Sequence, residues 1–138
     1  MTLGLLKNAQ FASIAVLFFF ALGLLPLSAI SQPPPEPKTL RHVVFFKFKD
    51  TATPVQIKQV EDAFRALPSR ISVIKEFEWG TNVSPENLNQ GFTHCFFLTF
   101  SSAADRDAYL AHPAHKDFGK LLGPYLDKVT VIDFWSQN

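Results

Sequence analysis

Residues 41–49, RHVVFFKFK, run directly into residues 50–68, DTATPVQIKQVEDAFRALP, and this junction is the most informative part of the chain. The first segment is rich in β-branched and aromatic residues, which favours a strand. In the second, Thr53, Pro54 and Gln56 are a capping threonine, a proline at the first helical position and the glutamine of a capping box. We therefore predict a strand followed at once by a helix.

The predicted helix is amphipathic. Four of its apolar residues follow one another at spacings of three, four and three, which places them on one face. They are Ile57, Val60, Phe64 and Leu67. We expect this helix to end before Pro68 and to lay its apolar face on a sheet.

The rest of the chain supplies three more strands and a second helical region. Residues 71–79, ISVIKEFEW, and 92–100, FTHCFFLTF, read as antiparallel strands separated by the turn-rich segment TNVSPENLNQG. Ser101 or Ser102 can cap a helix through ADRDAYLAH, a short helical piece follows in HKDFGKLLGPYL, and residues 128–135, KVTVIDFW, form the last strand. The order βαββαβ predicts an α+β, ferredoxin-like fold: a four-stranded antiparallel sheet with its helices on one face.

Both faces of the predicted sheet carry apolar residues. Strand alternation places His42, Phe46 and His94 on the face that we expect the helices to cover. Because helices can cover only one face, the apolar residues of the other face need a second cover, and a partner subunit is the economical one. We expect a homodimer held by Val43, Phe45, Phe97 and Val131.

The N-terminal part of the chain is typical of an exported protein. Residues 11–30 are a charge-free apolar run that follows Lys7, and small residues lie before Gln32. We predict a signal peptide over 1–31, then a proline-rich linker over 32–39 and a domain over 40–138. The domain would then be secreted or periplasmic. If residues 11–30 are retained, the same segment would be a membrane anchor, and this is the only membrane contact we expect.

Composition excludes some classes of protein. Removal of residues 1–31 takes away Lys7 and no acid, so 13 − 1 = 12 basic residues balance 12 acidic ones, which argues against nucleic-acid binding. The single cysteine, Cys95, cannot form an intrachain disulfide, and we interpret it as a small buried hydrophobe.

Four stretches in this order resemble the stress-responsive A/B barrel proteins: RHVVFFKFKD, EWGTNVSPEN, GFTHCFFLTFSS and AYLAHPAHKDF leading to VIDF. The resemblance covers residues 41–135. It implies a dimeric α/β barrel in which two ferredoxin-like sheets close together. Most members have no established reaction, and a few plant members are polyketide cyclases.

The resemblance to the cyclases implies a set of site residues. It covers His42, His94, Tyr109, His112 and His115. In the cyclases a tyrosine and a histidine at the positions of Tyr109 and His115 bind and deprotonate a linear polyketide. Where a second tyrosine is expected, this chain has Phe64, which departs from the cyclase pattern.

The chemistry of these residue types supports one predicted pocket. A histidine titrates near neutral pH, so His115 can act as a general base if Tyr109 orients it. Strand alternation brings His42 and His94 to the same side, so we predict that both converge with Tyr109 and His115. The candidate catalytic residues are His115, Tyr109 and His42, and the candidate ligand-binding residues are His94, His112, Phe64 and Phe46.

Two other interpretations of the HPAH segment are open. In the first it is a turn, in which Pro113 stops a helix and the imidazoles of His112 and His115 cap or bond the backbone. In the second the two histidines bind zinc, which we do not favour, because Pro113 disturbs their helix and no nearby cysteine or carboxylate completes a ligand set. We predict neither a metal nor a cofactor.

Three functions are compatible with the sequence. The first is an exported domain that binds a small, mainly apolar molecule in a cavity between sheet and helices. The second is a cofactor-independent cyclase-like or monooxygenase-like enzyme with His115 as its base. The third is a structural dimer whose interior is filled by its own phenylalanines. The sequence leaves open whether the protein is an enzyme, and a cavity near His115 would separate the third reading from the others.

Overall fold

The computed structural model describes residues 38–137. The predicted signal peptide or anchor, residues 1–31, lies outside the described residues, as does the proline-rich linker up to residue 37. Within residues 38–137 no helix has the length and apolar character needed to span a membrane.

The domain has the predicted βαββαβ order, with each helical region divided in two. The elements are β1 (Leu40–Phe48), α1 (Pro54–Arg65), α2 (Leu67–Arg70), β2 (Glu76–Thr81), β3 (His94–Phe100), α3 (Ala103–Ala111), α4 (Pro113–Leu122) and β4 (Leu126–Trp135). The sheet order is β2-β3-β1-β4 and every neighbouring pair is antiparallel. The ferredoxin-like prediction is confirmed.

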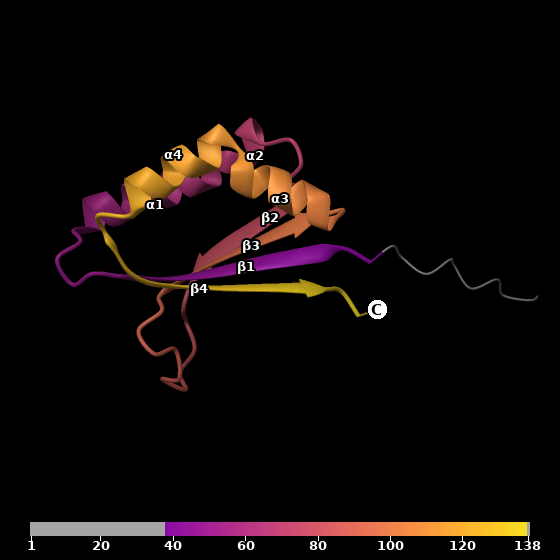
Figure 1. Ribbon diagram of the computed structural model, residues 1–138. Coiled ribbons are helices and arrows are strands. Elements are labelled where there is room, and N and C mark those ends of the chain that lie inside the picture. The colour runs from indigo at the N-terminus through magenta and orange to yellow at the C-terminus, as the bar shows by residue number, and fades with distance from the viewer. Residues whose placement is uncertain (1–37, 138) are drawn as a thin grey trace, which may run out of the picture. The chain divides into compact units, whose positions relative to one another are not determined.

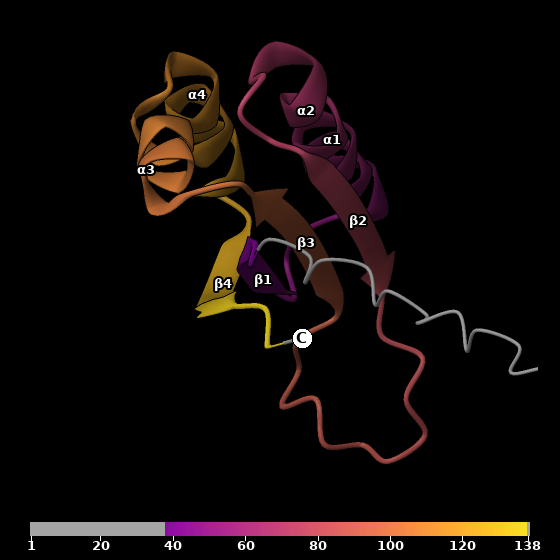
Figure 2. The same ribbon diagram turned by 90° about the vertical axis from the view of Figure 1, so that its right-hand side faces the viewer.

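The domain has two layers. All four helices lie on one side of the sheet (Figure 1), and Figure 2 shows α1 with α2 beside α3 with α4. The connection between β2 and β3 extends on the opposite side. One face of the sheet is therefore covered by helices and the other is not.

Local sequence signals explain where the helices begin. The Thr53 hydroxyl accepts from the backbone N–H of Gln56, and the Gln56 side chain accepts from the Thr53 N–H, so the predicted capping box is present. Ser102 caps α3 by accepting from the Asp105 N–H. Both signals are short-range, which is why they could be identified without tertiary information.

The second strand begins later than predicted. Residues 71–75 are not part of β2, which starts at Glu76. After α1 ends at Arg65, the chain forms the extra short helix α2, and the N–H of Ile71 bonds to the carbonyl of Leu67. Ile71 and Ile74 are buried in the core although they lie outside the strand, and their apolar character led us to predict a strand there.

A phenylalanine cluster fills the centre of the space between sheet and helices. It consists of Phe46, Phe64, Phe96 and Phe118. The rings of Phe64 and Phe96 are stacked with their centroids 4.1 Å apart, and Phe118 meets Phe64 edge-on at 4.8 Å. Burying such side chains supplies much of the hydrophobic stabilisation of a domain this size.

The opposite side of the sheet, which we call the helix-free face, is also apolar. Its apolar residues are Val43, Phe45, Cys95, Phe97, Ile132 and Phe134. Val131 does not belong to it, contrary to our prediction, because Val131 lies opposite Val44 and so faces the helices. In β4, Ile132 keeps 51% and Phe134 44% of its surface exposed in the single chain.

Candidate functional site

Residues from four elements meet around His42. Its Nδ1–H donates to Oδ1 of Asp133 at 2.6 Å, and the two residues lie directly opposite each other on β1 and β4. Tyr109 comes from α3 and His115 from α4. We call His42, Asp133, Tyr109 and His115 the His42 site.

Tyr109 lies between the two histidines. Its ring centroid is 5.7 Å from that of His42 and 4.4 Å from that of His115. Tyr109 and His42 are buried, with 1% and 4% of their surfaces exposed, whereas His115 is half-buried. Of these three rings, His115 is therefore the one that a molecule arriving from solvent would contact most easily.

The electrostatics suit acid–base chemistry. Burial raises the pKa of the Tyr109 hydroxyl well above its ordinary value, so this group stays protonated and can donate a hydrogen bond at neutral pH. Burial also lowers the pKa of His115, which a backbone contact with Leu110 opposes and the nearby His42 reinforces. A neutral imidazole beside a protonated phenol offers an acceptor and a donor at one place.

Asp133 connects the site to a charged residue on α3. Its second oxygen, Oδ2, accepts from Nη1 of Arg106 at 2.8 Å. Burial raises the pKa of the Asp133 carboxyl, but hydrogen bonds from Arg106 and His42 outweigh that effect, and the pKa is lowered overall. Asp133 therefore presents a carboxylate to His42.

His112 has a structural position. Its Nδ1 accepts from the backbone N–H of Ala114 at 3.1 Å, so the side chain caps α4, and Pro113 occupies the first helical position. For His112 this is the turn arrangement that we considered as an alternative. His115, the third residue of α4, instead contacts Tyr109.

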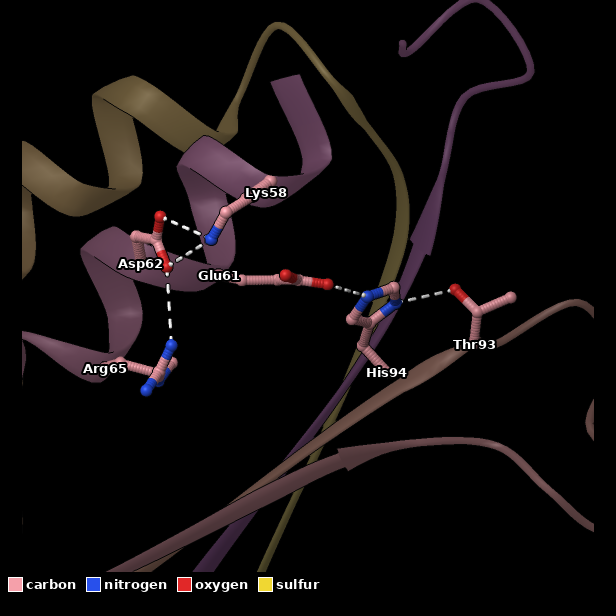
Figure 3. Close-up of polar contacts among 6 residues, drawn as sticks. All are labelled: Lys58, Glu61, Asp62, Arg65, Thr93 and His94. Carbon is pink, nitrogen blue, oxygen red and sulfur yellow. Dashed lines mark hydrogen bonds and ion pairs between the residues drawn. The ribbon is translucent and has the colours of Figure 1, made fainter. Parts of the chain in front are cut away.

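His94 does not join the other histidines. It lies opposite Phe46, whereas His42 lies opposite Leu98, so the two histidines are four residues apart along the strands, or about 13 Å. Nε2 of His94 donates to Glu61 on α1 at 2.9 Å (Figure 3). We call His94 and Glu61 the His94 pair.

The second ring nitrogen of His94 is also occupied. Thr93 donates its hydroxyl to Nδ1 at 2.8 Å, as Figure 3 shows. The His94 ring packs edge-on against Phe48, with a centroid separation of 5.0 Å. His94 therefore links α1 to the sheet with both nitrogens bonded.

Phe46 and Phe64, which we predicted as ligand-binding residues, belong to the phenylalanine cluster. Each has 2% of its surface exposed, and their ring centroids are 6.0 Å apart. Both pack against Phe118 as well. The cluster thus occupies the space between sheet and helices in which we expected a ligand.

Two cavities lie elsewhere on the domain. One, of about 620 Å³, opens on the helix-free face between Arg41, Glu76, Phe97 and Phe134. The other, of about 530 Å³, lies under the β2–β3 connection, where Phe45 and Phe92 contribute to its lining. Neither is lined by His42, Tyr109 or His115, whereas the lining of the second includes His94.

Metal-binding chemistry finds no support within residues 38–137. In that part of the chain no three histidine, cysteine, aspartate or glutamate side chains gather in a way that could hold a metal ion. His112 and His115, the pair with helical spacing, serve different neighbours: the backbone of Ala114 and the ring of Tyr109.

The sequence analysis missed the carboxylate partners of both buried histidines. Asp133 could have been found from strand alternation, because it shares the parity of Val129 and Val131 in the last strand. Glu61 carries no local signal that separates it from the other charged residues of α1. Arg106 had no local signal, since its partner is 27 residues away in the chain.

Comparisons with known proteins agree on one family. The family model described as the stress responsive A/B barrel domain matches residues 40–136. The stress-response A/B barrel domain-containing protein HS1 of Arabidopsis thaliana is 42% identical over 95 residues, which are 69% of this chain and 87% of that protein. Olivetolic acid cyclase of Cannabis sativa is 30% identical over 95 residues, 69% of this chain and 94% of the cyclase.

Solved structures give the same picture. A hydroxynitrile lyase from Passiflora edulis is similar with a TM-score of 0.69 and 31% identity, covering 73% of this chain and 95% of the lyase. A protein of unknown function from Thermobifida fusca, described as dimeric and ferredoxin-like, has a TM-score of 0.63 and 25% identity, with 72% and 92% of the two chains covered.

Proposed function

Because the chain belongs to the stress-responsive A/B barrel domain family, we propose that its domain is a cofactor-independent acid–base catalyst for a small, mainly apolar carbonyl compound or carbonyl adduct. The observation that carries this proposal is the contact of Tyr109 with both His42 and His115. A protonated phenol, which can donate a hydrogen bond, thus lies beside a neutral, half-buried imidazole, which can accept a proton.

The roles of the residues follow from their chemistry. His115 is neutral at physiological pH because its pKa is lowered, so it can accept a proton from the substrate. The Tyr109 hydroxyl, whose pKa is raised, donates a hydrogen bond to the oxygen on which negative charge develops. His42, held by Asp133, packs against Tyr109 and limits the positions of its ring.

Two proteins to which this chain is similar, olivetolic acid cyclase and a hydroxynitrile lyase, are named for reactions that a base and a hydrogen-bond donor would serve. Ring closure by a cyclase requires removal of a proton from a carbon next to a carbonyl group. Cleavage of a hydroxynitrile requires removal of the hydroxyl proton, after which the C–C bond to cyanide breaks, a carbonyl group forms and cyanide leaves. One base and one donor serve either reaction, and the chain offers both through His115 and Tyr109.

The position of the phenylalanine cluster restricts how the substrate binds. His115 is half-buried whereas Phe46, Phe64 and Tyr109 are buried. We infer that the reacting group approaches along the junction of α3 and α4, and that an apolar substituent packs on the surrounding rings.

The test is turnover by single-residue variants on a panel that includes an aromatic hydroxynitrile and a linear polyketide thioester. His115→Gln should lower turnover by at least about 100-fold, and Tyr109→Phe by about tenfold or more. Lys116→Gln, next to His115 on the exposed side of α4, is the matched control. Equal turnover of His115→Gln and Lys116→Gln would contradict the assignment of the base.

A second candidate is a structural dimer without a ligand. It is favoured by the phenylalanine cluster, whose Phe64 and Phe96 rings stack at 4.1 Å in the space where a ligand was expected. A panel of small carbonyl compounds tested by thermal unfolding distinguishes the two. If none of them raises the Tm of the domain and none is turned over, the structural function stands and the catalytic one fails.

We also propose that the domain is a homodimer joined through the helix-free face. Phe45, Phe97, Ile132 and Phe134 leave a partly exposed apolar surface there, and similar structures are described as dimeric. Phe97→Asp should dissociate or unfold the domain, because a buried unpaired carboxylate costs several kcal/mol. Light scattering of the unmodified domain at micromolar concentration should give twice the monomer mass. A folded monomer would contradict the dimer.

Export remains part of the proposal. It rests on the charge-free apolar residues 11–30 and the small residues before Gln32. N-terminal sequencing and intact mass of protein made in its host should show a chain that begins close to Gln32. A full-length chain recovered in membranes would favour an anchored domain instead.

A further inference from the structure

We propose that Arg106 is a positioning residue of the His42 site: it fixes the Asp133 carboxylate on His42 and so sets the orientation of the His42 ring beside Tyr109. The inference rests on the proposed function for its catalytic consequence. Its structural part can be tested without a substrate.

The carboxylate of Asp133 is held at both oxygens. Oδ1 accepts from His42 Nδ1 at 2.6 Å and Oδ2 accepts from Arg106 Nη1 at 2.8 Å. The carboxylate therefore cannot rotate about its own axis without losing one of the two bonds. If Arg106 is removed, a single hydrogen bond to His42 is left, and the carboxylate can swing while keeping it.

Arg106 is itself held by a second carboxylate. Its Nε and Nη2 donate to Oδ1 of Asp107 at 3.0 and 2.8 Å. Three guanidinium nitrogens are thus bonded, and the planar fork has little freedom left. Because Asp107 and Asp133 together carry more charge than Arg106 can neutralise, Arg106 is poorly suited to capture an anionic substrate. Positioning is the role that fits this environment.

Arg106 lies on α3, the helix that also carries Tyr109. Arg106 and Tyr109 are three residues apart on the helix, so their side chains project on neighbouring parts of its surface. Tyr109 contacts the His42 ring directly, and Arg106 reaches the same ring through Asp133. Helix α3 therefore restricts the His42 ring both by direct packing of Tyr109 and, through Asp133, by the ion pair of Arg106.

The contact between Arg106 and Asp133 lies at an edge of the sheet. Asp133 lies in β4, which pairs with β1 on one side and is the last strand in the sheet order. A residue on an edge strand has fewer neighbours to fix it than one on a central strand. The ion pair with Arg106 supplies the constraint that the strand position does not.

The electrostatics agree with a lasting ion pair. Hydrogen bonds from Asp133 and Asp107 raise the pKa of Arg106, and those from Arg106 and His42 keep the pKa of Asp133 low in spite of its burial. Both partners are therefore charged throughout the pH range in which His115 is neutral.

The experiment compares Arg106→Met and Arg106→Lys with the unmodified protein. Arg65→Met is the matched control, because Arg65 also lies on a helix and bonds to an aspartate, Asp62, at 3.4 Å, but beside the His94 pair (Figure 3). Carboxyl ¹³C NMR follows the titration of Asp133, and ¹⁵N NMR follows the ring nitrogens of His42. Turnover is measured on the substrate panel described above.

The expected result is specific to the positioning role. Arg106→Met should move the Asp133 titration to higher pH, change the His42 ring signals, and lower kcat about tenfold while KM changes less than about twofold. Arg106→Lys should restore part of each effect, because lysine supplies a charge without the fork. Arg65→Met should leave all three readouts as in the unmodified protein.

Two outcomes separate this inference from the proposed function. An Asp133 titration and His42 signals unchanged in Arg106→Met overturn the positioning role, even if His115→Gln abolishes turnover. Changed NMR signals in Arg106→Met, combined with full turnover in His115→Gln, support the role of Arg106 in holding His42 and overturn the proposed catalytic base.

Discussion

Two buried histidines on the same face of the sheet have different surroundings, although each is bonded to a carboxylate. His42 donates to Asp133 at 2.6 Å, and His94 donates to Glu61 at 2.9 Å. Beside His42 lies Tyr109, and beyond Tyr109 the half-buried His115. Beside His94 lie Phe48 and the Thr93 hydroxyl, which occupies the second ring nitrogen. A buried histidine–carboxylate pair therefore does not by itself indicate a reaction.

The carboxylates differ in the same way. Asp133 is shared between His42 and the α3 residue Arg106. On α1, Lys58 and Arg65 both bond to Asp62, and Glu61 turns to His94 (Figure 3). The His94 pair thus ties a helix to the sheet, whereas the His42 site joins two strands and two helices, and its second histidine, His115, is half-buried. Under the proposed function, the first supplies stability and the second supplies chemistry.

The largest expected effect concerns the phenylalanine cluster that separates the two regions. Phe64→Ala should lower the free energy of unfolding by about 3–5 kcal/mol, because Phe64 is buried and its ring stacks on Phe96. Denaturant unfolding measures the loss. Phe64→Leu, which leaves a smaller cavity, is the control and should cost clearly less. A loss below about 1 kcal/mol for Phe64→Ala would mean that the cluster does not hold the interior together.

The next effect tests the two pairs against each other. His94→Gln should destabilise the domain by about 1–3 kcal/mol, since Glu61 and Thr93 lose a buried partner, and should leave turnover unchanged. Asp133→Asn should mainly affect turnover: its loss of turnover, converted to a free energy, should exceed its loss in the free energy of unfolding. Unfolding curves and kcat on the same preparations give the ranking. If turnover falls in His94→Gln but not in Asp133→Asn, the assignment of the two regions is reversed.

The smallest effect is a dependence of stability on pH. The pKa of His115 in the folded domain lies below the ordinary 6.5. The unfolded chain therefore binds the proton more readily, and stability is present above pH 6.5 and is lost as pH falls through the folded pKa. His115→Gln should flatten the stability curve between about pH 8 and pH 5, measured by urea unfolding. A curve as steep as that of the unmodified domain would show that His115 is not held neutral by burial.

Those features of the fold that depend on local signals could be predicted from the sequence. The capping box at Thr53, the cap at Ser102 and the βαββαβ order need only neighbouring residues, and they are confirmed. The predicted start of the second strand was wrong, because Ile71 and Ile74 lie in a turn and are buried in the core. A short apolar run does not distinguish a strand from other buried backbone. Val131 was assigned to the wrong face, although strand alternation places it with Val129.

The candidate site could be predicted only in part. Alternation gives the face of a strand residue, and it placed His42 and His94 correctly on the helix side. It does not give the position along the strand relative to a helix, which is why His94 was expected beside Tyr109. Asp133 and Arg106 depend on the pairing of β1 with β4 and on the packing of α3, and neither can be derived from the spacing of residues in one segment.

The central claim is that chemistry belongs to the His42 site and not to the His94 pair, and NMR of the histidine rings tests it most directly. Ring signals of His42, His94 and His115 are followed during a pH titration and during addition of a small aromatic aldehyde and an aromatic hydroxynitrile. The account predicts that His115 titrates below 6.5 and that its signals, with those of Tyr109, respond to a ligand while His94 does not. A response at His94 without one at His115, or titration of His115 above 6.5, would contradict it.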